Sequence, residues 1–179
     1  MSEPLPAVRL RTDVRPADEA AVMDLVRRTG FFHEPEVLIA GELVRETLEK
    51  GRAAGYDFLF ADEADADGAD RMAGYACYGE IPCTVGSYDV YWIAVDPDRQ
   101  GRGLGRQLME AVAAAVRRAG GRTLYLDTSG REQYAPTWRF YERCGFAVAA
   151  RLADFYGPGD DKLIYARPVA GRPVAASGP

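Results

Sequence analysis

The sequence has little of what metal and redox proteins use. It contains one histidine, His33, and three cysteines, which are odd in number and too dispersed for a zinc framework. We therefore expect reduced, buried thiols and no bound metal. No apolar run approaches the length of a membrane span, and the first residues show neither the basic nor the apolar region of a secretory signal. The resulting expectation is a cytoplasmic protein without a membrane partner.

The sequence is also short of positive charge. It has 22 basic and 27 acidic residues, a net charge of −5, so the general attraction to nucleic-acid phosphates is absent and no nucleic-acid partner is expected. Arg99, Arg102 and Arg106 form a local cluster that suits a small phosphorylated ligand. The run from Asp62 to Asp70 holds five carboxylates but lacks the twelfth-position glutamate of a calcium loop. It predicts a solvated, mobile connection between two strands.

The hydrophobic pattern predicts one domain, residues 1–169, followed by a disordered tail, residues 170–179. Strands are expected over residues 8–14, 56–61, 71–78, 91–95, 122–128, 146–156 and 161–166, and helices over residues 15–28, 35–50, 104–119 and 136–144. The segment 91–128 is then a parallel strand–helix–strand crossover. The order β-α-α-β-β-β-α-β-α-β-β predicts an α/β fold in the broad sense. Its sheet is expected to be mixed, with parallel and antiparallel strands, as in α+β proteins.

Glycines mark the point where the apolar strand 91–95 leads into the helix at Leu104. The strand stops at Pro97, and Gly101, Gly103 and Gly105 follow at the helix entrance. Such a loop leaves backbone N–H groups unpaired and pointing one way, next to the arginines. This arrangement predicts a phosphate-binding site.

Two common phosphate-binding motifs do not fit this loop. A P-loop needs Gly-Lys-Ser or Gly-Lys-Thr after its spacer, and neither follows here. The dinucleotide fingerprint needs a third glycine where Arg106 or Leu108 stands.

The segment Gln100-Gly101-Arg102-Gly103-Leu104-Gly105 instead resembles the Gln/Arg-x-x-Gly-x-Gly/Ala signature of the GNAT superfamily of N-acetyltransferases. Phe140-Tyr141-x-x-x-Gly145-Phe146 resembles that family's second motif, and the order of elements is the GNAT order over roughly residues 8–168. The resemblance implies a GNAT-like fold with splayed central parallel strands. It also implies transfer of an acetyl group from acetyl-CoA to a primary amine by direct attack in a ternary complex.

The resemblance carries over to a set of candidate coenzyme contacts. It implies that acetyl-CoA contacts the strand residues Ile93, Ala94 and Val95, the loop residues Gln100, Gly101, Arg102, Gly103, Leu104, Gly105 and Arg106, and, on a later helix, Thr137 and Phe140. In the family the loop amides hold the pyrophosphate, and the strand backbone pairs with the pantetheine arm.

Tyr141 matches the position of the family's usual general acid, which protonates the departing thiolate; the alternative is a tyrosine that packs against CoA or orients it. The family often places a glutamate base on or beside the central strands, and the predicted strand 91–95 has none. Asp127 and Asp89 are the first candidates for the base, followed by Glu80, and each is also interpretable as a solvated or capping carboxylate. A chain of waters with no single base is a further alternative.

The acceptor is expected to be the amine of a small molecule or of a peptide. By resemblance Phe31, Phe32 and His33 line its site, and Ser129 or Tyr134 holds it. The alternatives are two aromatic side chains that fill the core beside a surface histidine, and a Thr128 or Ser129 side chain that caps a turn.

Two other classes of protein fit parts of the sequence. One is a catalytically inactive CoA-binding regulatory module, and the other is a nucleotide-binding protein that uses the same glycines. GNAT proteins frequently form homodimers through their last strands, and the sequence leaves this open.

Overall fold

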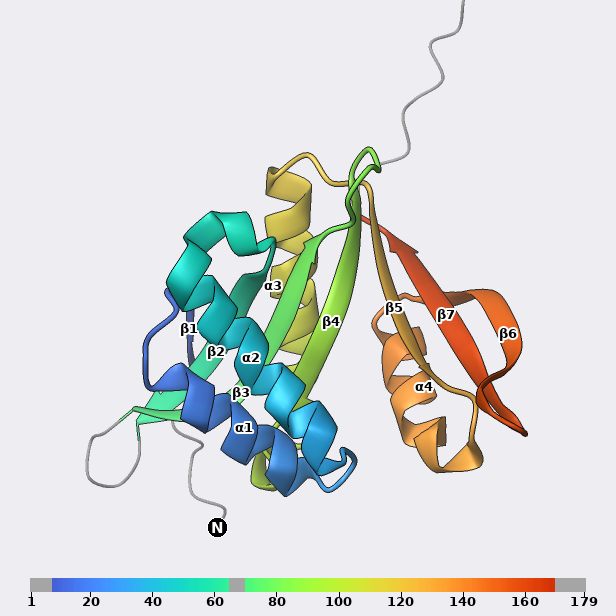
Figure 1. Cartoon of the computed structure of the whole chain (residues 1–179), viewed down its shortest axis with the longest axis horizontal. Helices are drawn as coiled ribbons and strands as arrows, with labels where there is room; N and C mark the ends of the chain where they lie inside the picture. The colour runs from blue at the N-terminus through green and yellow to red at the C-terminus, as the bar shows by residue number, and fades with distance from the viewer. Residues whose placement is uncertain (1–7, 65–69, 170–179) are drawn as a thin grey trace, which may run out of the picture. The chain divides into compact units, whose positions relative to one another are not determined.

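The computed structural model describes residues 8–64 and 70–169 (Figure 1). Its described residues divide into two compact units: residues 8–64 and 70–79 with 90–112, and residues 80–89 with 113–169. The strand β4 (Ser87–Val95) and the helix α3 (Leu104–Arg118) have residues in both. The predicted tail, residues 170–179, and the middle of the acidic run, residues 65–69, lie outside the described residues.

The strands form one mixed sheet in the order β1-β2-β3-β4-β5-β7-β6. Their bounds are β1 Val8–Arg11, β2 Asp57–Ala64, β3 Asp70–Glu80, β4 Ser87–Val95, β5 Thr123–Ser129, β6 Ala147–Gly157 and β7 Asp160–Pro168. β4 and β5 are parallel, with Ser87 to Asp89 in register with Thr123 to Tyr125. The pairs β1–β2, β2–β3, β5–β7 and β6–β7 are antiparallel.

The helices confirm the predicted order of elements. They are α1 Asp18–Thr29, α2 Glu34–Lys50, α3 Leu104–Arg118 and α4 Ala135–Arg143, with short 3₁₀ segments at Gly51–Ala54, Pro97–Arg99 and Glu132–Tyr134. The predicted mixed α/β fold is therefore confirmed. The main differences are at element ends: the first strand is shorter than predicted, and β4 begins at Ser87 rather than at residue 91.

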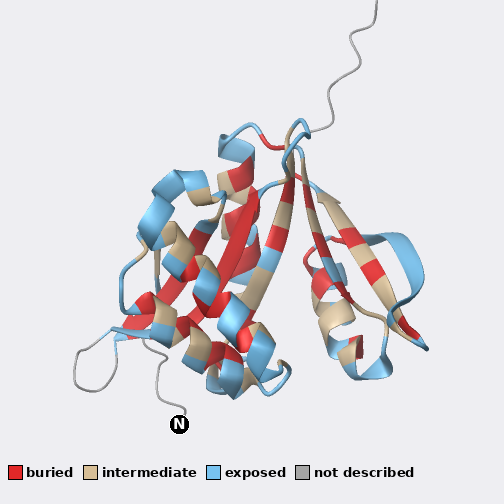
Figure 2. Cartoon of the chain, viewed as in Figure 1, coloured by how far each residue is buried: buried red, intermediate tan, exposed pale blue. Residues whose placement is uncertain are grey.

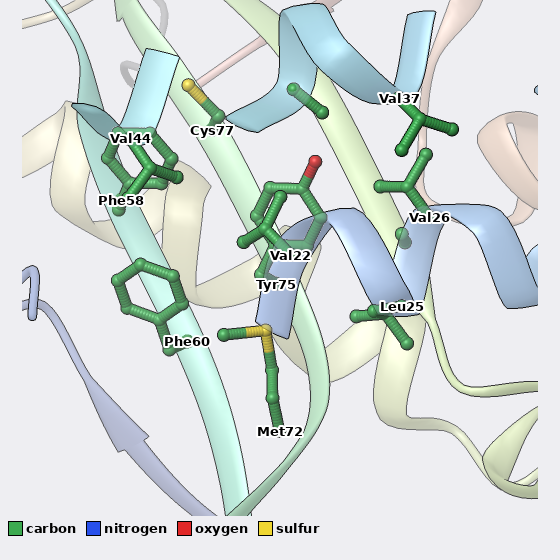
Figure 3. Packing of buried hydrophobic residues seen from close by; sticks show 12 residues of the cluster. Val22, Leu25, Val26, Val37, Val44, Phe58, Phe60, Met72, Tyr75 and Cys77 are labelled. Carbon is green, nitrogen blue, oxygen red and sulfur yellow. The ribbon is translucent and has the colours of Figure 1, made fainter. Parts of the chain in front are cut away.

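The first unit has a core between its strands and the helices α1 and α2, which lie together over one face of β2 and β3 (Figure 1). The inner faces of these elements are buried, as the red segments of Figure 2 show. The cluster consists of Val22, Leu25, Val26, Val37, Ala40, Val44, Phe58, Phe60, Met72, Tyr75, Cys77 and Ala94 (Figure 3). Helical spacing in α1 and α2 and strand alternation in β2 bring these residues to one side.

The structure corrects the prediction that the acidic run from Asp62 to Asp70 is a solvated, mobile connection. Asp62 and Glu63 belong to β2, and only 3% and 4% of their surfaces are exposed. Asp62 accepts a hydrogen bond from Arg11 Nε at 2.5 Å, and Glu63 accepts from Arg99 Nε at 2.6 Å. The prediction of a solvated connection was therefore wrong for these two residues, because a buried carboxylate is tolerated once a cation pairs with it.

Tyr75 is a fully buried residue whose hydroxyl has no hydrogen-bond partner among the described residues. Its ring stacks on Phe60, and burial, together with the nearby Cys77, raises the pKa of the phenol well above its usual value. A buried hydroxyl without a partner costs free energy. We expect Tyr75→Phe to raise the free energy of unfolding by roughly 1 kcal/mol, measured by urea denaturation.

Tyr156→Phe is the matched control for that measurement. The hydroxyl of Tyr156 donates to Asp127 at 3.0 Å, so its removal is not expected to stabilise the protein. A loss of stability in Tyr75→Phe would show that the buried hydroxyl has a partner, such as a bound water.

Candidate active site

The loop between β4 and α3 takes the backbone course that its glycines permit. After the 3₁₀ turn Pro97–Arg99, Gly101 and Gly103 have φ of +71° and +87°, and α3 begins at Leu104. Apart from the glycine itself and its two chain neighbours, no heavy atom of the described residues lies within 4 Å of a Cβ placed on either glycine. The glycines are thus required by the left-handed backbone rather than by crowding, and the space beside them is open.

The same loop leads directly into the N-terminus of α3. Its first amide N–H groups have no partner within the helix and carry the positive end of the helix dipole. Arg102 and Arg106 are exposed, and neither has an ion-pair partner within residues 8–64 and 70–169. Open glycines, free helix amides and unpaired arginines together form a site that can bind an anion.

Arg99 does not share this role. Its Nε donates to both oxygens of Glu63, at 2.6 Å and 2.9 Å, and Glu63 is buried. The sequence placed Arg99 in one cluster with Arg102 and Arg106; the structure assigns it to an ion pair that joins the loop to β2.

Sequence reasoning missed the buried anchor at the start of the loop. Asp96 accepts hydrogen bonds from Arg28 Nη1 and Arg71 Nη2, both at 2.6 Å. Burial alone raises the pKa of Asp96, but the hydrogen bond from Arg28 and the charges of the two arginines bring it below its usual value. No sequence signal joins these residues, because Arg28 and Arg71 lie 68 and 25 positions from Asp96.

The predicted pantetheine strand is the second half of β4. Ala94 is buried in the core cluster, whereas Ile93 and Val95 are half-buried. The carbonyl oxygen of Val95 accepts a hydrogen bond from Gln100 Nε2 at 3.2 Å, so the loop's first motif residue is bound to the strand that precedes it.

The segment between α1 and α2 carries the predicted acceptor residues of the first unit. Phe31 is 47% exposed, while Phe32 is half-buried with its ring 4.8 Å from that of Trp92 on β4. His33 opens α2, and its backbone N–H donates to Glu36 at 2.8 Å. Phe32 thus partly fills the edge of the core, which was the alternative interpretation, and Phe31 presents an aromatic surface to solvent.

In the second unit, Tyr141 lies on α4 with 8% of its surface exposed. Its ring packs against those of Phe140, Phe146 and Tyr165, with centroids 5.6, 6.2 and 5.6 Å away. Burial, and next the charge of Asp127, raise the pKa of the Tyr141 phenol. The group therefore stays protonated at neutral and mildly alkaline pH. Phe140 and the other predicted coenzyme contact of this helix, Thr137, are half-buried.

Asp127, near the end of β5, already has two partners. Tyr156 donates its hydroxyl to Oδ1 at 3.0 Å, and Lys162 Nζ lies 2.6 Å from Oδ2. The ammonium of Lys162 also lies 4.8 Å from the centre of the Phe155 ring. Asp127 is thus part of a network that ties β5 to β6 and β7, and no sequence pattern indicated it. Asp89, the other base candidate, is half-buried on β4, in register with Tyr125.

Ser129 and Tyr134 lie at the two ends of the turn after β5. The Ser129 hydroxyl donates to Asp160 at 2.5 Å, and its carbonyl oxygen accepts from Trp138 Nε1 at 3.0 Å. Tyr134 ends the 3₁₀ segment before α4 and is half-buried. Ser129 therefore has a structural hydrogen bond, which agrees with its alternative role in a turn.

The described residues lack two features that other classes of protein use. Within residues 8–64 and 70–169, no group of three or more His, Cys, Asp or Glu side chains is arranged to hold a metal ion. None of the helices described combines the length and apolarity needed to cross a membrane.

Comparison with known proteins gives the family. The model described as the acetyltransferase (GNAT) family matches residues 28–146, two thirds of the chain. The chain therefore belongs to the GNAT acetyltransferase family, whose members are acyl-CoA-dependent N-acyltransferases. A crystal structure from Desulfovibrio desulfuricans, described as a candidate GNAT acetyltransferase, matches it with a TM-score of 0.88 at 53% identity, covering 92% of this chain and 100% of that one.

The names of the curated relatives refer to different acceptors. Mycothiol acetyltransferase from Actinosynnema mirum is 32% identical over 145 residues, which cover 80% of this chain and 46% of that protein. The [ribosomal protein bS18]-alanine N-acetyltransferase of Salmonella typhimurium is 34% identical over 104 residues, 56% of this chain and 67% of that protein. The chain thus spans about half the length of its mycothiol acetyltransferase relative.

Proposed function

We propose that this chain transfers an acetyl group from acetyl-CoA to the primary amine of a small molecule or peptide, by direct attack in a ternary complex. The amine nitrogen forms a bond to the carbonyl carbon, the bond from carbon to sulfur breaks, and the proton lost by nitrogen ends on the thiol. The observation that carries the proposal is the open loop of Gly101 and Gly103 at the N-terminus of α3.

The two halves of the coenzyme bind to different parts of the chain. The pyrophosphate lies on the loop and helix amides from Gln100 to Arg106, where Arg102 and Arg106 add positive charge. The pantetheine arm follows the backbone of residues 93–95, which also offers an N–H group to the developing oxyanion. Thr137 and Phe140 contact the coenzyme from α4.

Tyr141 is the proposed general acid. Because its phenol is a weaker acid than a thiol, donation to a free thiolate is unfavourable. We propose that donation accompanies cleavage of the bond from carbon to sulfur, and that the proton released by the amine restores the phenol. Burial, and next the charge of Asp127, raise the pKa of Tyr141 and keep the donor form populated.

The amine needs a base, because an alkyl ammonium with a pKa near 10.4 is protonated at neutral pH. Asp127 is the better supported of the two candidates, since its charge acts on Tyr141 within the same unit. We expect Asp127→Asn to lower kcat/KM by about 10²-fold. Asp89→Asn is the matched control with the same charge change. If neither substitution lowers kcat/KM, a chain of waters carries the proton.

The acceptor site is proposed to include Phe31, Phe32, Ser129 and Tyr134. The names of the curated relatives include a small thiol and a ribosomal protein, so they support both a small-molecule and a peptide amine. The exposed Phe31 adds an aromatic surface for an apolar part of the acceptor.

The test of the proposed function has two stages. CoA and acetyl-CoA should protect the chain against thermal unfolding, because a ligand that binds only the folded state stabilises it. Thioester consumption is then followed with a panel of amino acids, polyamines and peptides. Protection without turnover would favour the inactive CoA-binding module, and protection by ATP or NAD but not by CoA would favour a nucleotide-binding protein.

A further inference from the structure

Asp96 is a buried carboxylate to which the proposed reaction gives no role. Only 1% of its surface is exposed, and it stands where β4 ends and the glycine loop begins. Its Oδ2 accepts from Arg28 on α1 and from Arg71 on β3, while its Oδ1 accepts from the backbone N–H of Asp98 at 2.9 Å. One side chain thus connects three elements and caps the 3₁₀ turn Pro97–Arg99.

The backbone around Asp96 is held as well. Its N–H donates to the carbonyl oxygen of Ala73 at 2.9 Å, and its carbonyl oxygen accepts from the N–H of Arg99 at 2.8 Å. Ala73 lies at the irregularity of β3, where the register with β2 shifts by one residue. The far end of the turn is fixed by the pair of Arg99 with buried Glu63. The turn therefore has little freedom immediately before Gly101.

We propose that Asp96 is a positioning residue for coenzyme binding. By holding Arg28 and Arg71 it fixes the turn, and the turn sets the direction of the amides from Gly101 onward. This inference rests on the proposed function, in which those amides receive the pyrophosphate. A loop already ordered in its binding conformation loses less conformational entropy when the ligand arrives, so the anion binds more tightly.

Electrostatics alone gives the opposite expectation. A carboxylate close to a phosphate site repels the ligand, so neutralising it should strengthen binding. Positioning predicts that the same neutralisation weakens binding, because the two arginines lose their common partner. The sign of the change in Asp96→Asn therefore separates the two effects.

Asp98→Asn is the matched control. Asp98 is exposed in the same turn, and its backbone N–H rather than its side chain makes the cap to Asp96. The substitution removes one negative charge at the same place in the chain without touching Arg28 or Arg71. It measures the purely electrostatic effect.

The experiment compares the wild type with both variants using two probes. Titration calorimetry gives the Kd of 3′,5′-ADP, which carries phosphates, and steady-state kinetics gives kcat/KM for S-acetylpantetheine, which has none. We expect Asp96→Asn to raise the Kd of 3′,5′-ADP by at least about tenfold. A small misplacement of positioning groups can lower the rate of a reaction by up to ~10²-fold, and a comparable loss is expected for binding. Asp98→Asn should bind it as the wild type does, or more tightly. Turnover of S-acetylpantetheine should be the same in all three proteins.

Unchanged or tighter binding of 3′,5′-ADP by Asp96→Asn would overturn the inference, as would an equal loss of S-acetylpantetheine turnover. If Asp96→Asn does not fold, Arg71→Met takes its place; Arg71 is 45% exposed, and its loss removes one of the two arginines. The inference is supported if Arg71→Met binds 3′,5′-ADP more weakly than the wild type and Arg71→Lys recovers part of the lost affinity. Unchanged binding of 3′,5′-ADP by Arg71→Met would overturn it. Failure of the proposed function appears in the wild type itself, as no binding of CoA, whereas failure of this inference appears only in the variants.

Discussion

Replacing Tyr141 with phenylalanine is expected to lower kcat by about 10²- to 10³-fold while leaving the KM for acetyl-CoA close to that of the wild type. The substitution removes one hydroxyl and keeps the ring contacts with Phe140, Phe146 and Tyr165. The fold should therefore persist, with an unchanged midpoint of thermal unfolding. Steady-state kinetics with the best acceptor of the amine panel gives both constants.

Tyr165→Phe is the control for a buried tyrosine that only packs. Tyr165 is 2% exposed, its ring adjoins that of Tyr141, and burial raises the pKa of its phenol as well. It should keep nearly full turnover. If Tyr141→Phe also turns over at the wild-type rate, Tyr141 is a packing residue and the proposed acid is wrong.

The pH profile and the leaving group sharpen the test. Because the pKa of Tyr141 is raised, its ionisation should cause no loss of activity at mildly alkaline pH. An acetyl thioester of a more acidic thiol needs less help from an acid, so Tyr141→Phe should be less impaired with such a donor than with acetyl-CoA. A purely structural defect would impair both donors equally.

Replacing Arg11 with methionine is expected to lower the free energy of unfolding by about 3–5 kcal/mol, the usual cost of leaving a buried charge without its partner. The Arg11 side chain is 8% exposed and is shared by Asp18 and Asp62, whose side chains are 5% and 3% exposed. Its guanidinium also lies 4.2 Å from the centre of the Phe60 ring. Burial lowers the pKa of Arg11, but the hydrogen bonds to the two carboxylates outweigh it and raise the pKa overall.

Arg9→Met is the matched control, two residues away on the same strand. Arg9 pairs with Asp70, but the two side chains are 61% and 44% exposed, and exposed pairs contribute only about 0–1 kcal/mol. Urea denaturation followed by circular dichroism at pH 7 compares the two variants. The triple variant Arg11→Met, Asp18→Asn and Asp62→Asn should recover part of the loss, because it removes the unpaired charges. An equal, small effect in Arg11→Met and Arg9→Met would contradict this account.

Much of the fold could be predicted because its causes are local. Apolar spacing is repeated within a single helix, so α3 could be read from residues such as Leu104, Leu108 and Val112, which the structure buries. The glycine loop could be predicted for the same reason: positive φ at Gly101 and Gly103 is a property of those residues and their immediate neighbours. The family followed from two short motifs and the order of elements between them.

Ion pairs between distant residues could not be predicted in this way. Glu63 was interpreted as part of a solvated acidic run, but it is buried because Arg99, 36 positions away, pairs with it. Asp127 was a candidate base on grounds of position, and the structure adds Lys162 and Tyr156 as its partners from another pair of strands. A charged residue in a sequence does not reveal whether a partner will be brought to it.

The sequence by itself determined the family, the order of helices and strands, and the loop that supplies the anion site, since each depends on residues close together in the chain. Only the tertiary structure decided which charges are buried and what each one holds. Asp96 shows the difference: its position before the loop is plain in the sequence, but Arg28 and Arg71 reach it only after α1 and β3 have packed beside β4. The physical reason is that burying a charge depends on a partner, and the fold alone brings that partner into contact.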